Sequence, residues 1–102
     1  MPNEPLNDAL LRSNKQGQKS THTNVSVGVT ATQILPLNSN RKSCVIFNNS
    51  AVTVFVGPDN TVTTGNGLGI PTQSTLTDPD SIDAWFGIVA SGTADVRVIE
   101  VT

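Results

Sequence analysis

The sequence predicts an all-β fold: a small antiparallel β-sandwich or barrel of about 7–8 short strands with an extended N-terminal arm. Thr, Ser and Asn supply 32 of the 102 residues, and there are 12 Val and 6 Ile but no Tyr. β-branched residues favour strands, while small polar residues favour turns. Short apolar segments separated by turn residues recur along the chain, and its length allows one domain.

Residues 1–23 differ from the rest of the chain and are predicted to form the arm. Beyond Met1 their only apolar side chains are Leu6, Ala9, Leu10 and Leu11. Too little apolar surface is present to offset the entropy of ordering this segment alone. The first three of those side chains follow i, i+3, i+4 spacing, which predicts a short helical turn within residues 5–13. Two outcomes stay open: a frayed tail, or an arm that folds against a partner.

Residues 24–102 carry the period-two pattern of strands and are predicted to form the sandwich. Turn residues such as Asn, Gly, Asp and Pro separate the apolar segments. The strands are expected at 25–30, 33–37, 43–47, 52–56, 75–77, 84–90 and 95–101, and Ile70 is expected to re-enter the body between the fourth and fifth.

Local patterns predict how some of these strands are used. The run 43–47 is continuously apolar after Ser43, which is typical of a central strand covered on both faces. It is expected to form a hairpin with 52–56 through a tight turn at 48–50, because Asn tolerates the left-handed conformation. Leu35 and Leu37 would share one face, with Pro36 marking an edge or bulge.

Three aromatic residues bear on which side of a sheet faces the core. Trp85 and Phe86 are adjacent, so in a strand they point to opposite faces, and one of them should belong to the core. The other, together with Phe55, is expected on an outer sheet surface that packs against another subunit. The alternative is a two-sided sandwich strand that is partly covered by loops.

Composition excludes several functional classes. No apolar run reaches the roughly 18–20 residues that a membrane span requires, and no basic and apolar leader opens the chain. One Cys and one His build neither an internal disulfide nor a zinc site, so no metal or cofactor is expected. A formal charge of -2 argues against nucleic-acid binding.

The residues also lack an assembled catalytic set, so the chain is not expected to be an enzyme. His22 falls in the arm, and Cys44 lies in the most apolar strand, where a small core residue is the simpler interpretation. The Gly65–Gly69 loop has neither the lysine nor the following helix that phosphate-binding loops use. One cation-site candidate stays open against an ordinary turn, formed by Asp78, Asp80 and Asp83.

Charge is divided unevenly along the chain. Residues 1–42 hold five basic and two acidic side chains, a net charge of +3, whereas residues 43–102 hold one basic and six acidic ones, a net charge of -5. A basic arm and an acidic body can attract each other between neighbouring copies. The alternative is two ordinary solvated surfaces.

The body resembles small β-domains of tailed-bacteriophage virion proteins, which include head decoration proteins. Five segments carry the resemblance in order: Val27–Leu35 (VGVTATQIL), Asn40–Ser43 (NRKS), Asn48–Ser50 (NNS), Val54–Gly57 (VFVG) and Ala90–Val98 (ASGTADVRV). The match covers about three quarters of the chain. The arm matches no known motif.

The resemblance implies a capsid decoration, or cement, protein that binds the outer surface of the virion after synthesis in the host cytoplasm. Its partners would be the major capsid protein or other virion proteins, and neighbouring copies as a homo-oligomer, with no nucleic acid and no membrane. The arm would supply the contacts, apolar from Leu6, Leu10 and Leu11 and basic from Arg12, Lys15 and Lys19. Alternatives are a tail, baseplate or head-fibre-base module, or a carbohydrate-binding host-attachment module.

Overall fold

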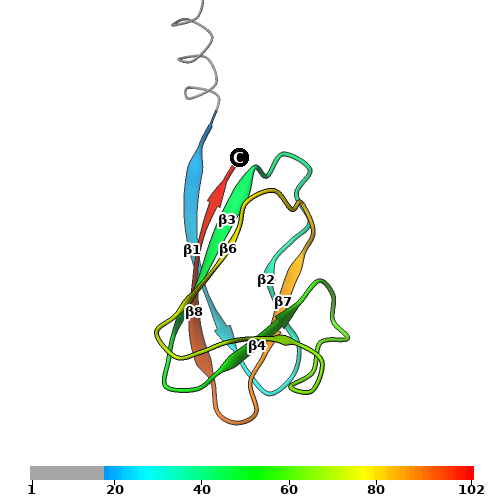
Figure 1. Cartoon of the computed structure of the whole chain (residues 1–102), viewed down its shortest axis with the longest axis vertical. Helices are drawn as coiled ribbons and strands as arrows, with labels where there is room; N and C mark the ends of the chain where they lie inside the picture. Colours follow the sequence, from blue (N-terminus) through cyan, green and yellow to red (C-terminus); the bar gives the residue numbers. More distant parts are fainter. Residues whose placement is uncertain (1–17) are drawn as a thin grey trace, which may run out of the picture.

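Eight short antiparallel strands form two stacked four-stranded sheets in the computed structural model, which describes residues 18–102 (Figure 1). Sheet A has the order β1-β8-β3-β6, and sheet B has the order β2-β7-β4-β5. The strands are β1 (Ser20–Val27), β2 (Thr32–Leu35), β3 (Ser43–Asn49), β4 (Val54–Gly57), β5 (Leu68–Ile70), β6 (Thr75–Asp78), β7 (Trp85–Ile88) and β8 (Ala94–Val101). The predicted small β-sandwich is confirmed.

The connections give this sandwich the topology of a jelly roll. Six of the seven connections between the described strands carry the chain from one sheet to the other, and only β4–β5 stays within a sheet. Eight strands wound in this way form two interleaved Greek keys. Most neighbouring strands in the sheets are distant in the chain. The fold therefore depends on the contacts that hold each connection between the sheets, which we call a crossing.

The core lies between the sheets and is built mainly from valine and isoleucine. Alternate residues of each strand point inward, so Val54 and Val56 are buried while Phe55 between them faces outward. Cys44 is 1% exposed and lies in this core, as expected. Trp85 packs against the core from the partly buried layer, and Phe86 points to the other face.

Two expectations about strand faces are wrong. β3 is central in sheet A, yet only its inward side chains are buried, and Val45 and Phe47 on its other face are partly exposed. Val29 and Leu37 are 57% and 63% exposed, because β1 ends at Val27 and β2 ends before Pro36. The alternation of buried and exposed side chains therefore ends where each of these two strands ends.

The expected hairpin between β3 and β4 is also wrong, because the chain crosses to the other sheet at this point. Asn48 is 1% exposed, and its side-chain amide donates to the backbone oxygens of Val52 (2.7 Å), Ile70 (2.9 Å) and Pro71 (3.2 Å). One buried side chain thereby joins the β3–β4 crossing to the β5–β6 crossing. The left-handed backbone expected at the asparagines occurs at Gln73 instead, with a φ of 57°.

A buried arginine holds the two crossings at the other end of the sandwich. The Arg41 side chain is fully buried, and its Nε lies 2.8 Å from Glu100 Oε2 on β8. Its Nη1 donates to the backbone oxygen of Asp83 and its Nη2 to that of Pro36. The β2–β3 and β6–β7 connections are thus bound to sheet A through one guanidinium.

The ends of the described chain lie side by side in sheet A (Figure 1). Lys19 and Thr102 exchange both backbone hydrogen bonds, at 2.7 and 2.8 Å, next to the β1–β8 ladder. β1 starts at Ser20, so residues 20–23, which the sequence assigned to the arm, form the first half of an edge strand. The helical turn expected within residues 5–13 lies outside the described residues.

Gly87 on β7 faces the core at a point where side chains of the neighbouring strands β2 and β4 leave no room for a side chain. A Cβ there would lie 2.8 Å from Ile34 Cδ1 and 3.3 Å from Val54 Cγ1. We predict that Gly87→Ala lowers the free energy of unfolding by about 1–3 kcal/mol, because overpacking a filled core forces side chains off their rotamers. Urea denaturation measures the change. Gly28→Ala is the control, since a Cβ there meets nothing within 4 Å; equal losses in both variants would contradict the packing argument.

Arg41 should be worth far more than an exposed arginine. Arg41→Ala leaves the Glu100 carboxylate without its buried partner and removes the donors to two backbone oxygens. We expect the free energy of unfolding to fall by about 3–5 kcal/mol. The matched control is Arg97→Ala. Because the Arg97–Asp95 ion pair is solvent-exposed, its loss should lower the free energy of unfolding by less than about 1 kcal/mol. Similar denaturation midpoints for the two variants would refute the role given to Arg41.

Candidate functional site

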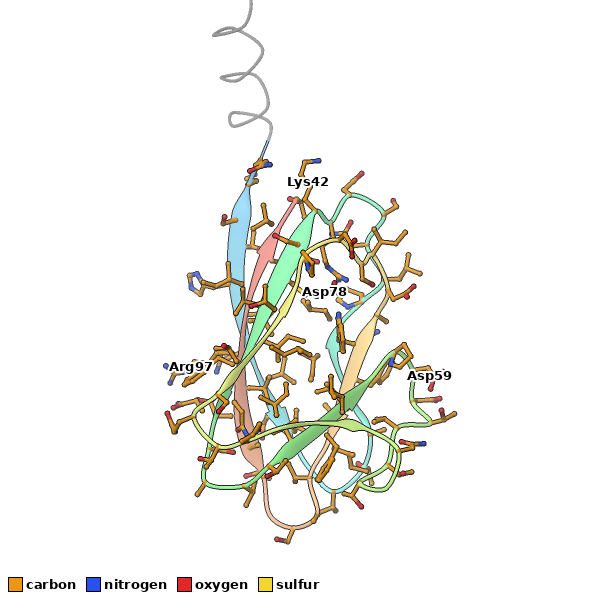
Figure 2. All side chains as sticks on the ribbon, in the orientation of Figure 1. Lys42, Asp59, Asp78 and Arg97 are labelled. Atoms are coloured by element: carbon orange, nitrogen blue, oxygen red, sulfur yellow. The ribbon has the colours of Figure 1, made fainter. Side chains whose placement is uncertain are left out.

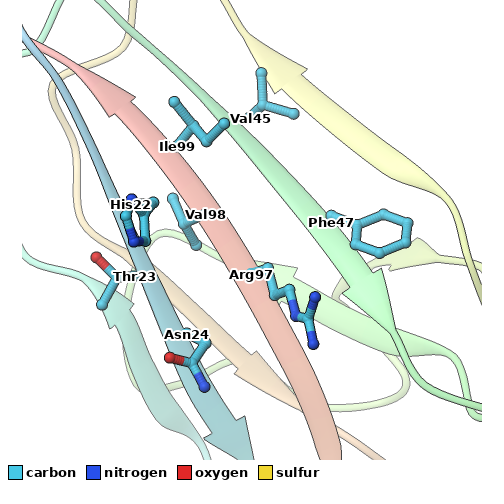
Figure 3. A pocket seen from close by; sticks show the side chains of 8 residues that line it. All are labelled: His22, Thr23, Asn24, Val45, Phe47, Arg97, Val98 and Ile99. Carbon is cyan, nitrogen blue, oxygen red and sulfur yellow. The ribbon is translucent and has the colours of Figure 1, made fainter.

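The outer face of sheet A presents apolar side chains to solvent. Val45 on β3 lies directly opposite Ile99 on β8, and Phe47 lies opposite Arg97. On the other side of β8, His22 of β1 lies opposite Ile99. Figure 3 shows these side chains spread across three neighbouring strands. Strand pairing alone therefore gathers them, although 77 positions of sequence separate His22 from Ile99.

These residues line a shallow groove of about 510 Å³, which we call the sheet A groove. Ile99 is 52% exposed, and Val45 and Phe47 are partly buried. The lining is completed by His22, Thr23, Asn24, Arg97 and Val98. An exposed apolar floor with a polar rim is suited to receive apolar side chains of another protein segment.

Few charges border the sheet A groove, and those present are already paired. Arg97 Nε lies 3.2 Å from Asp95 Oδ2, and the Asn49 amide donates to the same carboxylate oxygen at 3.1 Å. The amide of Asn49 is the main cause of a lowered pKa at Asp95. Because both partners are solvent-exposed, this ion pair orders the rim more than it stabilises the fold.

The three acidic residues considered for a cation are not brought together as ligands. Asp78 is buried, with Oδ2 accepting the Trp85 indole N–H at 3.2 Å and Oδ1 accepting the backbone N–H of Ser81 at 3.1 Å. Asp80 and Asp83 are exposed. Within residues 18–102, no group of three or more His, Cys, Asp or Glu side chains is placed to hold a metal ion. Asp78 instead closes its turn, and Figure 2 shows it inside the sandwich.

The Gly65–Gly69 region is an ordered turn that leads into β5. Thr63 Oγ1 accepts the backbone N–H groups of Gly65 and Asn66, and the Asn66 side-chain oxygen accepts the N–H of Thr63. These donors are used within the loop, so they are not directed at an anion. Asp59 belongs to the same connection, and the Thr61 hydroxyl lowers its pKa.

Trp85 borders a second hollow of about 440 Å³ beside this loop. Its ring is half-buried against the core, and its indole N–H is donated to Asp78. A sugar-binding module needs an aromatic ring that is free to stack with its face exposed. The Trp85 ring is therefore oriented for packing against the core.

The predicted contact residues of the arm are divided by the structure. Leu6, Leu10, Leu11, Arg12 and Lys15 lie outside the described residues. Lys19 is described: it is exposed and stands at the root of β1, beside Lys42. Arg41, which the charge division placed with the basic arm, is buried in its ion pair and adds nothing to a basic surface.

The sheet A groove is the surface that the sequence did not predict. A run covered on both faces would place Val45 and Phe47 in the interior, whereas the structure leaves both partly exposed. Strict alternation in β8, with buried Val96 and Val98 against exposed Arg97 and Ile99, was the available signal. Only the register of β3 against β8 shows that these outward residues adjoin.

The two residues considered as catalytic groups, His22 and Cys44, face different sides of sheet A. His22 is an exposed residue of β1, whereas Cys44 faces the core from β3. Burial raises the pKa of the Cys44 thiol and disfavours the thiolate, which is the nucleophilic form. Within the described residues there is also no helix that could cross a membrane.

We predict that Cys44 in the folded protein does not react with a thiol reagent such as DTNB at neutral pH. The raised pKa and the buried sulfur both slow attack, so the reaction should require unfolding. Absorbance at the reporter wavelength follows the reaction, with urea-denatured protein as the control that reacts completely. Immediate stoichiometric labelling of the native protein would show that this thiol is accessible.

Comparisons with known proteins give one weak structural similarity. No protein-family model matches the sequence, and no curated protein matches it. Among solved structures, the chain is similar to one of the Bacillus endospore appendages, described as a novel family of disulfide-linked pili. The two chains are 13% identical, the match covers 82% of this chain and 83% of that chain, and the TM-score is 0.48. A similarity of this size carries no argument about function.

Proposed function

We propose that this chain is a non-enzymatic structural protein of a tailed-bacteriophage virion that decorates the outer capsid surface and stabilises the head. The jelly-roll sandwich would be the body, and the N-terminal segment would be its attachment to neighbouring capsid subunits. Each bound copy favours the assembled shell by mass action, and many copies act together.

The observation that carries the proposal is that two features suited to contact share sheet A. The N-terminal segment enters the body through β1, and the sheet A groove lies on the face of the same sheet. Inside the sandwich, Arg41, Asn48 and Asp78 are fully engaged in holding the crossings. An interior engaged in the fold and two contact features on one sheet suit a protein whose function is attachment.

The sequence of the N-terminal segment supports the same proposal. Residues 1–17 contain the apolar Leu6, Leu10 and Leu11 and the basic Arg12 and Lys15. We expect the leucines to enter apolar grooves of the capsid, while the basic residues, with Lys19, pair with acidic capsid residues.

Deletion of residues 1–17 tests this attachment. The deletion must stop there, because removal of residues 1–23 would also destroy half of β1. We predict that the shortened protein keeps its cooperative unfolding transition and loses binding to capsids assembled without this protein. Co-sedimentation with such particles, quantified over a range of protein concentrations, measures the affinity.

Point variants in the full chain separate the attachment from a loss of fold. Leu6→Ser with Leu10→Ser and Leu11→Ser should weaken capsid binding at least tenfold, since each buried leucine contributes roughly 1.5–3 kcal/mol. Asn7→Ser with Asn14→Ser is the matched control from the same segment and should bind normally. Unchanged binding by both the deletion and the leucine variant would overturn the proposed attachment. Location of the protein in intact particles by cryo-electron microscopy tests the capsid assignment itself.

A further inference from the structure

The four edges of the two sheets differ sharply in how well they are protected against pairing with another strand. β2 is four residues long, carries a register shift between Gln33 and Leu35, and is followed by Pro36. β5 has three residues and is followed by Pro71, and β6 has four and is followed by Pro79. Short length, bulges and prolines are the devices by which natural proteins block edge-to-edge pairing.

β1 carries none of these devices. It is eight residues long, pairs with β8 without a register shift, and has the sequence STHTNVSV, with no proline, lysine or acidic residue. Thr and Val supply half of its side chains and favour extended structure. In the part of the chain that the structure describes, β1 is therefore the one long, uncharged and unprotected edge.

The backbone groups that β1 leaves free can be assigned residue by residue. Lys19 and Thr102 exchange both hydrogen bonds, so they form a hydrogen-bonded pair of the antiparallel ladder. In such a ladder hydrogen-bonded pairs alternate, which makes Thr21, Thr23 and Val25 the next residues bonded to β8. The residues between them direct N–H and C=O away from β8, toward solvent: Ser20, His22, Asn24 and Ser26.

We propose that β1 is an assembly edge that pairs antiparallel with β1 of a second copy of this chain, around a two-fold axis at Thr23. In this register Ser20 meets Ser26 of the second copy, and His22 meets Asn24. It is the two-fold register in which all four outward residues pair with outward residues. Sheet A then continues through both copies as one eight-stranded sheet.

The side chains that meet across this junction are compatible with each other. Thr23 lies opposite Thr23 of the second copy, and Thr21 lies opposite Val25. Thr–Thr and β-branched pairs stabilise adjacent strands, whereas like charges directly opposite destabilise them. β1 contains no Lys, Arg, Asp or Glu that would meet its own copy. The joined sheet also brings the two sheet A grooves onto one continuous surface.

The N-terminal segment of a neighbour is the other candidate strand, and its composition disfavours it. Residues 1–17 contain no Val, Ile or Thr and include two prolines. Proline lacks the N–H that a ladder requires, and the remaining residues have weak strand preference. A second β1 is the better partner because it brings strand-forming residues of matched length.

A cysteine at the proposed axis tests the pairing directly. Thr23 is exposed, and non-hydrogen-bonded partners in antiparallel strands have Cα atoms about 4.5 Å apart, within the roughly 4.4–6.8 Å range of disulfides. We predict that full-length Thr23→Cys forms a disulfide-linked dimer of twice 10.7 kDa under mild oxidation, seen on a non-reducing gel. The native Cys44 is buried and does not compete.

The control is Thr75→Cys, an exposed threonine on β6 at the opposite edge of sheet A, which should stay monomeric under the same oxidation. Equal cross-linking at both positions, or none at Thr23→Cys, would overturn the proposal.

Variants that block the edge should lower the association measured by sedimentation equilibrium of the otherwise unmodified chain. Asn24→Pro removes an outward N–H and leaves the backbone hydrogen bonds to β8 in place, and Thr23→Lys places two ammonium groups opposite each other. Each should weaken the dimer by about tenfold or more. Thr75→Lys is the charge-matched control and should have no effect.

Two further outcomes decide between partners and separate this proposal from the capsid proposal. The dimer should persist after deletion of residues 1–17, and its loss there would instead identify the N-terminal segment as the paired strand. A protein that remains monomeric up to millimolar concentration would refute the pairing. Capsid binding is a different readout, so it can fail while the dimer forms, and the dimer can fail while capsid binding is retained.

Discussion

The rest of the structure depends on how the crossings between the sheets are held. A jelly roll exchanges sheets at almost every connection, so β4 and β5 are the one consecutive pair of described strands that lie side by side in a sheet. Asn48 joins two crossings through three backbone oxygens, and Arg41 joins two others through two oxygens and Glu100. The remaining two meet where Val89 N–H donates to the oxygen of Gly28. Buried polar groups whose partners are all present rigidify a fold and specify one arrangement.

The use of buried polar side chains at the crossings limits which side chains remain free to contact other molecules. Within residues 18–102 the buried polar side chains all have hydrogen-bond partners, and those partners are mostly the backbone of the crossings themselves. The polar side chains of the interior thereby serve the fold. The surface that remains available is the outside of the sheets, where Val45 and Phe47 are partly exposed and Ile99 is exposed.

Local patterns predicted the local facts and failed at the long-range ones. The alternation Val52, Val54, Val56 correctly assigned the inward face of β4, and the apolar setting of Cys44 correctly placed it in the core. The β3–β4 hairpin was wrong because the acceptors of Asn48 include Ile70, which lies 22 positions ahead in the chain, where turn chemistry has no influence. The sheet A groove was missed for the same reason, since its floor depends on a register between strands far apart in sequence. The contact roles of the N-terminal residues, that of Lys19 included, stay predictions.

The backbone hydrogen bonds between Lys19 and Thr102 hold the two ends of the body next to each other. The point at which the N-terminal segment joins the body lies within one peptide pair of the point at which the chain ends. Transfer of that segment to the C-terminus would therefore leave its root almost where it is, and a short linker could close the body while a loop elsewhere is opened. The place at which the segment joins the sandwich is consequently set by the Lys19–Thr102 pair and is largely independent of chain order.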